Sequence, residues 1–143
     1  EAMINLIIAT HGELGAYLIE TAEMIVGEQT EGMEIFSISP RIPAEVAQKQ
    51  IKKTIEKMRS KDGVIIFTDI LGGTPTNIAV LSASKESNVV IISGVNLTMI
   101  ITAFSYRLKL PFKELVSKIT FDGKKSICEV KKLLTKSKKR KHK

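Results

Sequence analysis

The chain has 143 residues, of which 43% are hydrophobic and 26% are charged, with a formal net charge of +7. This length allows one cored domain, and the composition excludes a wholly disordered chain. The single cysteine, Cys128, excludes a disulfide scaffold and a thiolate metal cage, and it fits a reducing cytoplasm.

The positive charge is concentrated at the C-terminal end. Eight of the 22 basic residues and none of the 15 acidic residues follow Val130, so the rest of the chain is nearly neutral. We therefore expect one domain over residues 3–134 and a basic tail over residues 135–143. The tail lacks interleaved aromatic residues, which favours a solvated end over a surface for nucleic acid or anionic lipid. The apolar runs are too short to cross a bilayer, and no secretion leader is expected.

Four short apolar runs rich in β-branched residues predict strands, at residues 4–9, 34–38, 64–68 and 89–93. Three of them have continuous apolar cores, as strands do when both faces are covered. Helical spacing separates them, in the stripes Leu14, Leu18, Ala22, Ile25 and Ala47, Ile51, Ile55, Met58. Strand and helix alternate four times, which predicts an α/β fold with a doubly wound parallel sheet and helices on both faces.

Helix starts are also indicated. Pro43 and Pro75 suit first-turn positions, while Thr74 and Asn96 are expected N-caps of the third and fourth helices.

The fourth helix, which starts near Leu97, is apolar around most of its circumference. Such a helix must be buried on more than one side, which favours a homodimer; the alternative is a helix sunk in the core of its own chain. Residues 113–119 predict a short fifth helix. Residues 127–133 fit either a helix or an edge strand.

Polar residues follow the first and third predicted strands. Ligands of an open parallel sheet bind beyond the carboxyl ends of the strands, where the strand order reverses. If these two strands are neighbours, His11 and Asp69 share that crevice. Gly72 and Gly73 then form a permissive turn into a helix N-terminus, which favours an anion.

An imidazole, a carboxylate and an anion site together indicate phosphoryl chemistry. A neutral imidazole is a nucleophile toward phosphorus, and a carboxylate bonded to one ring nitrogen leaves the lone pair of the other nitrogen free. The alternative is that His11 is a loop histidine with satisfied hydrogen bonds and no chemical role.

Other motifs fail on inspection. His11 and His142 are the only histidines, so no histidine-based metal spacing exists, and we expect no metal and no cofactor. Residues 123–126 read Gly-Lys-Lys-Ser, but Lys118 stands where a phosphate-binding P-loop needs glycine.

Several spaced motifs carry a family resemblance. They are Ile-Ala-Thr-His-Gly at 8–12, Thr-Ala-Glu-Met at 21–24, Gly-Glu-Gln at 27–29, Asp69, Gly-Gly-Thr-Pro at 72–75, Asn77, and Gly-Val-Asn at 94–96 with Met99. In this order they resemble the IIA component of the mannose-family sugar phosphotransferase system. The likeness covers about residues 3–133, nearly the whole domain.

The resemblance implies a phosphocarrier. The histidine matching His11 accepts phosphoryl on Nε2 from the histidine-containing phosphocarrier protein HPr and passes it to a IIB domain, while the aspartate matching Asp69 holds the ring. We take Thr10, Gly12, Gly72, Gly73 and Thr74 as the phosphoryl-binding residues. The family fold has strand order 2-1-3-4 plus an antiparallel edge strand exchanged across a homodimer, which residues 127–130 would supply.

The resemblance also sets the expected partners. Some members continue through an Ala/Pro-rich linker into IIB, whereas this sequence ends in the basic residues 136–143, so we expect IIB on a separate polypeptide. The IIC and IID membrane subunits would be indirect partners of a cytoplasmic protein that associates peripherally with the transporter; no nucleic-acid partner is expected. Two alternatives stay open: a IIA-like donor subunit of a dihydroxyacetone kinase, and a non-catalytic anion- or nucleotide-binding module.

Overall fold

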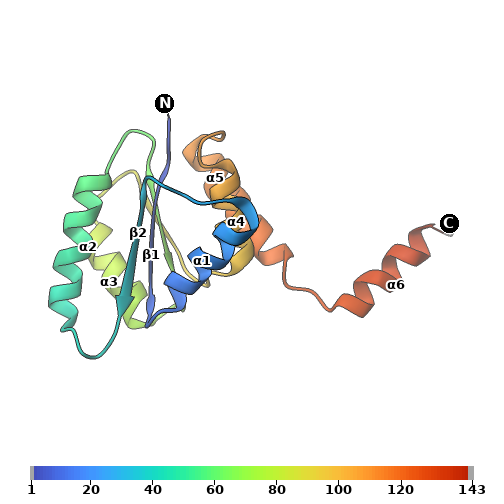
Figure 1. The fold of residues 1–143 in the computed structure, drawn as a ribbon, viewed down its shortest axis with the longest axis horizontal. Coiled ribbons are helices and arrows are strands. Elements are labelled where there is room, and N and C mark those ends of the chain that lie inside the picture. The colour runs from blue at the N-terminus through green and yellow to red at the C-terminus, as the bar shows by residue number, and fades with distance from the viewer. Residues whose placement is uncertain (1, 142–143) are drawn as a thin grey trace.

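The computed structural model describes residues 2–141. Four parallel strands form one sheet in the order β2-β1-β3-β4, and helices cover both of its faces (Figure 1). The elements in chain order are β1 (Asn5–His11), α1 (Leu14–Val26), β2 (Met33–Ile38), α2 (Ala44–Met58), β3 (Val64–Thr68), α3 (Thr74–Ala83), β4 (Val89–Ile92), α4 (Leu97–Tyr106), α5 (Phe112–Lys125) and α6 (Val130–Lys141). The predicted α/β alternation and the strand order 2-1-3-4 are confirmed.

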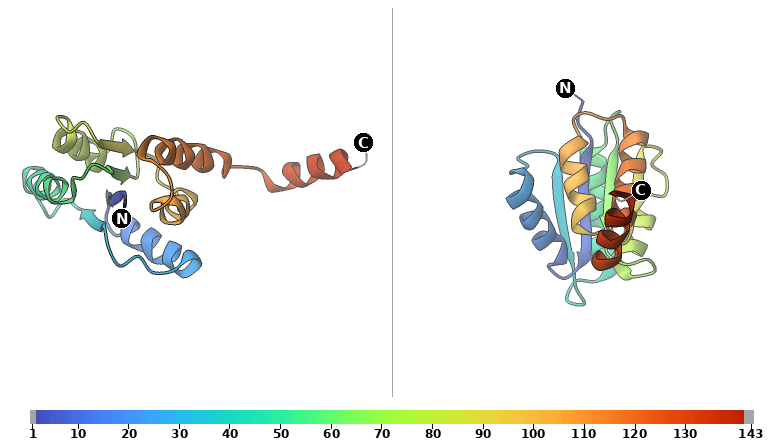
Figure 2. Two further views of the ribbon diagram at one scale, coloured as in Figure 1. Left: turned by 90° about the horizontal axis from the view of Figure 1, so that it is seen from above. Right: turned by 90° about the vertical axis from the view of Figure 1, so that its right-hand side faces the viewer.

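Strand residues alternate between two apolar clusters, one on each face of the sheet. Leu6 and Phe67 belong to the cluster beneath α1, α4 and α5, whereas Ile7 and Ile66 belong to the cluster beneath α2 and α3. Figure 2 shows these two groups of helices on opposite sides of the sheet. Because both faces are buried, the central strands need apolar residues at every position, and this is why their sequences do not alternate with polar residues.

The helix starts follow the predictions in part, since Pro43 lies at the N-cap of α2, one residue before the first turn in which it was expected. Asn96 caps α4, since its side chain accepts a hydrogen bond from the N–H of Met99 at 3.0 Å, and Pro75 lies in the first turn of α3. The prediction that Thr74 is an N-cap is wrong. Gly73 holds that position with an extended backbone, because its N–H bonds to the carbonyl of Ile70 and closes the preceding turn one residue earlier.

The apolar helix α4 is covered within its own chain. It packs against α1 and α5, and Ile100 and Phe104 share a cluster with Leu115 and Ile119 of α5. α5 is longer than predicted, and it closes on α4 at Gly123, where an added Cβ would lie 2.5 Å from Cγ of Met99. The apolar character of α4 is therefore explained without a second copy of the chain.

The C-terminal region differs from the edge strand that the resemblance implies. Residues 127–129 lie outside helices and strands, and α6 then leads away from the sheet (Figure 1). Within residues 2–141 all strand pairs are parallel, and the segment forms no strand paired with β4. The lysines and leucines of residues 130–141 are good helix formers, which agrees with the helix seen there.

None of the helices between residues 2 and 141 combines the length and the apolar character that a membrane crossing requires.

Candidate functional site

Two polar residues meet at the carboxyl ends of the two central strands. His11 is the last residue of β1, and Asp69 directly follows Thr68, the last residue of β3. The strands are hydrogen-bonded neighbours in which Ala9 pairs with Thr68, so Asp69 and His11 extend from the same edge of the sheet. This is the juxtaposition that the sequence predicts for a strand order that reverses here.

The carboxylate of Asp69 holds both the backbone and the ring of His11. Its Oδ2 accepts from the backbone N–H of His11 at 2.9 Å and lies 2.8 Å from ring Nδ1, while its Oδ1 accepts from the N–H of Ile70 at 3.0 Å. The Asp69 side chain is 11% exposed and the His11 side chain is 55% exposed. Because a carboxylate only accepts, this contact places the ring proton on Nδ1. The lone pair of Nε2 is then free, and no residue in the described part of the chain bonds to it.

The environment of Asp69 favours its charged form. Partial burial on its own would raise the pKa of the carboxyl, but the hydrogen bonds from the backbone N–H and the ring of His11 outweigh it, and the pKa is lowered from 3.8. Asp69 is therefore a carboxylate at neutral pH, able to stabilise positive charge on the imidazole.

This lowered pKa predicts a pH-dependent contribution to stability. A group whose pKa is lower in the folded chain stabilises it above the pKa of the unfolded chain, and that stabilisation is lost as the pH falls through the folded pKa. We expect the difference in unfolding free energy between wild type and Asp69→Asn to be constant at neutral pH and to shrink below 3.8. Urea unfolding at a series of pH values measures it; a difference that stays constant down to acid would contradict the assignment.

A glycine turn closes the site beside the free nitrogen. A Cβ added at Gly73 would lie 3.0 Å from Cε1 of the His11 ring, the carbon between the two nitrogens. Gly72 has φ +82°, a left-handed conformation that favours glycine. Thr74 then begins α3, whose first N–H groups have no partner within the helix and whose dipole favours an anion.

An open pocket of about 370 Å³ lies in front of the ring. Its lining combines His11 and Thr74 with the β2–α2 connection, and the lining residues are His11, Ile38, Ser39, Pro40, Ile42, Pro43, Ala44 and Thr74. The structure thus brings His11, Asp69, Gly73 and Thr74 together at one rim that is open to another molecule.

Of the predicted phosphoryl-binding residues, Thr10 lies buried beneath the turn that follows β1, whereas Gly12 is exposed within that turn. Thr10 is fully buried, and its hydroxyl accepts from the N–H of Gly15 at 2.8 Å. The N–H of Gly12 donates to the carbonyl of Ile38 at 2.9 Å, and its φ of +54° allows the chain to turn into α1. In this arrangement Thr10 and Gly12 fix the direction in which His11 leaves the strand.

A family model described as "PTS system fructose IIA component" (EIIA-man) matches residues 5–120. The chain belongs to this IIA family. The PTS system mannose-specific EIIAB component of Escherichia coli strain K12 is 30% identical over 129 residues, which cover 90% of this chain. The chain spans only 40% of the length of that relative.

Two further relatives cover most of both chains. The PTS system fructose-specific EIIA component of Bacillus subtilis strain 168 is 28% identical over 120 residues, or 82% of this chain and 80% of that one. The crystal structure of the PTS IIA protein associated with the fucose utilization operon of Streptococcus pneumoniae superposes with a TM-score of 0.79 at 27% identity, covering 94% of this chain and 99% of the other.

Sequence reasoning missed a hydroxyl pair that supports the site of this IIA domain. The hydroxyls of Thr76 and Thr68 lie 2.7 Å apart, and Thr76 donates to the carbonyl of Ile70 at 2.7 Å. Because Thr76 has one hydroxyl proton, Thr68 must donate to Thr76 in turn. The pair fixes the turn that carries Asp69. The one sequence signal for Thr76 is its position between the Gly-Gly-Thr-Pro motif at 72–75 and Asn77.

Removing this hydroxyl should destabilise the IIA domain. Thr76→Val keeps the side-chain shape but leaves the buried hydroxyl of Thr68 without its partner and the carbonyl of Ile70 with the N–H of Gly73 as its remaining donor. We expect a loss of about 1 to 2 kcal/mol of unfolding free energy in urea titrations. Thr120→Val is the matched control, since the Thr120 hydroxyl bonds only to carbonyls of its own helix. Equal losses in the two variants would show that the Thr76 hydroxyl has no special role.

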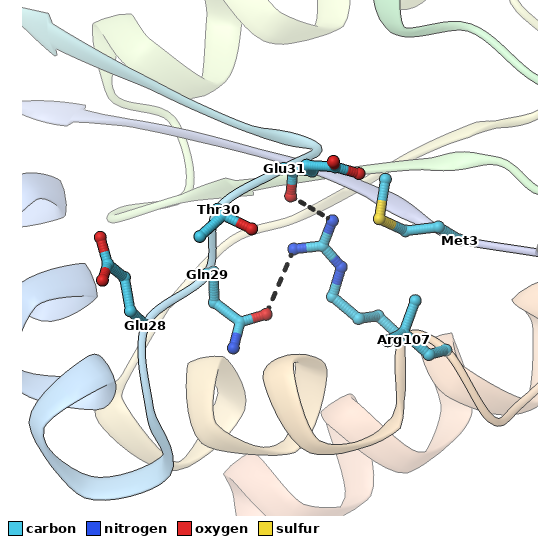
Figure 3. Close-up of a pocket in the computed structure, with 7 residues that line it drawn as sticks. Met3, Glu28, Gln29, Thr30, Glu31 and Arg107 are labelled. Atoms are coloured by element: carbon cyan, nitrogen blue, oxygen red, sulfur yellow. Dashed lines mark hydrogen bonds between the residues drawn. The ribbon is translucent and has the colours of Figure 1, made fainter.

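A second cavity, of about 530 Å³, lies at the opposite end of the sheet (Figure 3). Its buried cation, Arg107, donates from Nη2 to the carbonyls of Glu31 and Gly32 at 2.7 and 3.1 Å. Burial lowers the pKa of Arg107, and the charge of Glu31 partly opposes this effect. The arginine ties the end of α4 to the connection before β2, which is a structural role remote from His11.

Proposed function

We propose that the chain is a phosphoryl carrier of the phosphoenolpyruvate-dependent sugar phosphotransferase system. Nε2 of His11 accepts phosphoryl from HPr and passes it to a IIB domain during uptake of a mannose-family sugar. The observation that carries the proposal is the 2.8 Å contact between Nδ1 of His11 and Oδ2 of Asp69, which leaves Nε2 unprotonated at an open rim. Family membership supports it independently.

The transfer step needs no base. The lone pair of Nε2 attacks phosphorus, a P–N bond to His11 forms, and the P–N bond to the histidine of HPr breaks with its electron pair returning to that ring. The proton on Nδ1 of His11 stays in place, so the phosphorylated ring is cationic. The carboxylate of Asp69 stabilises this charge, as oriented carboxylates do for imidazolium ions.

The glycine turn supplies the place for the phosphoryl oxygens. Gly73 lies against Cε1 of the ring, and a Cβ added there would crowd this carbon at 3.0 Å and Cγ2 of Ile70 at 2.7 Å. The N–H groups at the start of α3 and the exposed side chain of Thr74 are near donors for an anion. We assign Gly72, Gly73 and Thr74 to phosphoryl binding, and we assign Thr10 and Gly12 to positioning His11.

The decisive experiment reconstitutes the transfer. The purified chain is mixed with phosphoenolpyruvate, enzyme I and HPr, and its intact mass is measured with each component omitted in turn. We expect the mass of one phosphoryl group, dependent on both proteins and lost in acid, as for a phosphoramidate. A mass that does not change in the complete mixture would refute the proposal and favour a non-catalytic anion-binding module.

The protein that accepts phosphoryl from His11 distinguishes the sugar phosphotransferase system from the dihydroxyacetone kinase alternative. Phosphorylated chain is separated from the donors and mixed with a IIB domain or with the subunits of a dihydroxyacetone kinase. Discharge to IIB is expected. Discharge to the kinase alone would place the chain in the alternative, kinase-linked role.

A homodimer is part of the proposal. β4 is an edge strand with one neighbour, and Ile127, 80% exposed, lies beside it at a shallow pocket that includes Ile92 and Met99. We place residues 127–130 of a second copy along β4 as the antiparallel fifth strand. A cytoplasmic carrier of this kind would meet the IIC and IID subunits only indirectly, through IIB.

A further inference from the structure

Helix α6 is unlike the other helices of the molecule. It extends from the body in Figure 1 and in the left view of Figure 2, and none of its residues from Val130 to Lys141 is buried. The family model matches residues 5–120, and this helix lies beyond that match. The proposed phosphoryl transfer at His11 does not involve helix α6.

The helix has one apolar side and is basic elsewhere. At 100° per residue, Val130, Leu133, Leu134 and Ser137 fall on one side. Leu133 and Leu134 are 55% and 57% exposed. Six basic residues occupy the flanks and the back, and they are Lys131, Lys132, Lys136, Lys138, Lys139 and Arg140. Lys141, the last residue of the helix, ends the apolar side. Residues 130–141 include no acidic side chain.

This charge pattern is unfavourable for an isolated helix. A 12-residue helix is marginal alone in water, and like charges three or four residues apart destabilise it further. A polyanionic surface would remove that repulsion. The remainder of the chain is nearly neutral, with 14 basic and 15 acidic residues, so it neither supplies a strong counter-charge nor repels an anionic surface.

We propose that α6 binds an anionic lipid surface. The helix lies in the plane of the headgroups with Leu133 and Leu134 inserted toward the acyl chains and the flanking lysines against the headgroup charges. Nucleic acid would use the lysines but not the leucines, and residues 130–141 hold no aromatic, Asn or Gln side chain for stacking on or reading bases. A second copy of α6 would bring equal charges together. The apolar side is what the sequence-based expectation of a solvated tail overlooked.

Vesicle sedimentation with the full-length chain tests the proposal. Vesicles of equal parts phosphatidylcholine and phosphatidylglycerol are compared with vesicles of phosphatidylcholine alone, at low and high salt. We expect binding to the anionic vesicles only, weakened by salt, with an increase in helical circular dichroism on binding. Equal binding to both vesicles, or to neither, would overturn the proposal.

Matched variants separate the two parts of the helix. Replacing Lys131, Lys136 and Lys138 by Gln should weaken binding on the order of 100-fold, about fivefold for each charge. The same change at Lys52, Lys53 and Lys57, exposed on α2, should have little effect. Leu134→Ser should weaken binding about 10-fold, whereas Leu81→Ser, on the 61% exposed Leu81 of α3, should not.

Binding of α6 to nucleic acid or to a second copy of the chain would give different results in these experiments. Binding that survives Leu134→Ser but is competed away by duplex DNA would assign α6 to nucleic acid. A dimer that dissociates on Leu134→Ser, measured by light scattering without lipid, would assign it to a second copy. The proposal is independent of the proposed function, since phosphorylation of His11 is measured in solution without vesicles and should be unchanged in all these variants.

Discussion

Replacing His11 by alanine is expected to abolish phosphorylation of the chain by phosphoenolpyruvate, enzyme I and HPr. The nucleophile is lost, and no other side chain within residues 2–141 has a ring nitrogen to replace it. The side chain is 55% exposed, so the fold should survive with a change in unfolding free energy of about 1 kcal/mol or less. Intact mass and thermal unfolding of the same sample measure the two effects.

The control is His142→Ala, which removes the only other histidine of the chain. It should gain one phosphoryl group at the wild-type rate. Phosphoryl uptake by His11→Ala, or its loss in His142→Ala, would move the acceptor away from the rim of the sheet.

Asp69→Asn is expected to slow phosphoryl transfer by about 100-fold while the chain stays folded. In the wild type Oδ2 takes both contacts from His11, and Oδ1 accepts from the N–H of Ile70. Asparagine has one oxygen and one NH₂ group. If the NH₂ faces Ile70, it meets the backbone N–H of Ile70, and two hydrogen-bond donors face each other. If it faces His11, Nδ1 becomes the acceptor and the ring proton moves to Nε2, which can no longer attack.

Single-turnover transfer from phosphorylated HPr measures this rate. Asp62→Asn is the control, because Asp62 accepts from the N–H of Met3 at the other end of the sheet and asparagine can keep that bond. An unchanged rate in Asp69→Asn would remove the carboxylate from the mechanism and leave it a structural role only.

The central fold is predictable from local pattern, because each strand is buried on both faces. Continuous apolar runs such as that at residues 64–68 fit a parallel sheet between helices, and the predicted stripe of α2 matches the cluster that it covers. The predicted stripe of α1 is wrong in part, because Leu14 and Ile25 are exposed and Ile19 packs in the core in their place. The coverage of α4 could not be predicted, since it depends on how α5 folds back over Ile100 and Phe104. The conformation of residues 127–129 is equally nonlocal, because a strand forms there only where a sheet edge pairs with it.

The site was predictable where its residues follow strands directly. His11 and Asp69 required only the assumption that their strands are neighbours, and Gly73 required only a turn into a helix. The hydroxyl of Thr76 and the wall formed by residues 38–44 required the actual path of the chain. For the same reason Thr10, which adjoins His11 in sequence, points to the opposite side of the strand and is buried, because side chains alternate along a strand.

In the proposed carrier role, the position of His11 at one open rim constrains the order in which phosphoryl is gained and passed on. The ring is tied at Nδ1, so its reactive nitrogen faces one direction only, and a donor docked there blocks the acceptor. Loading and unloading must therefore alternate, with each protein leaving before the next arrives. An excess of unphosphorylated donor protein should then slow transfer to the acceptor, because it occupies the same surface. The overall transfer rate would depend on how quickly the donor protein dissociates.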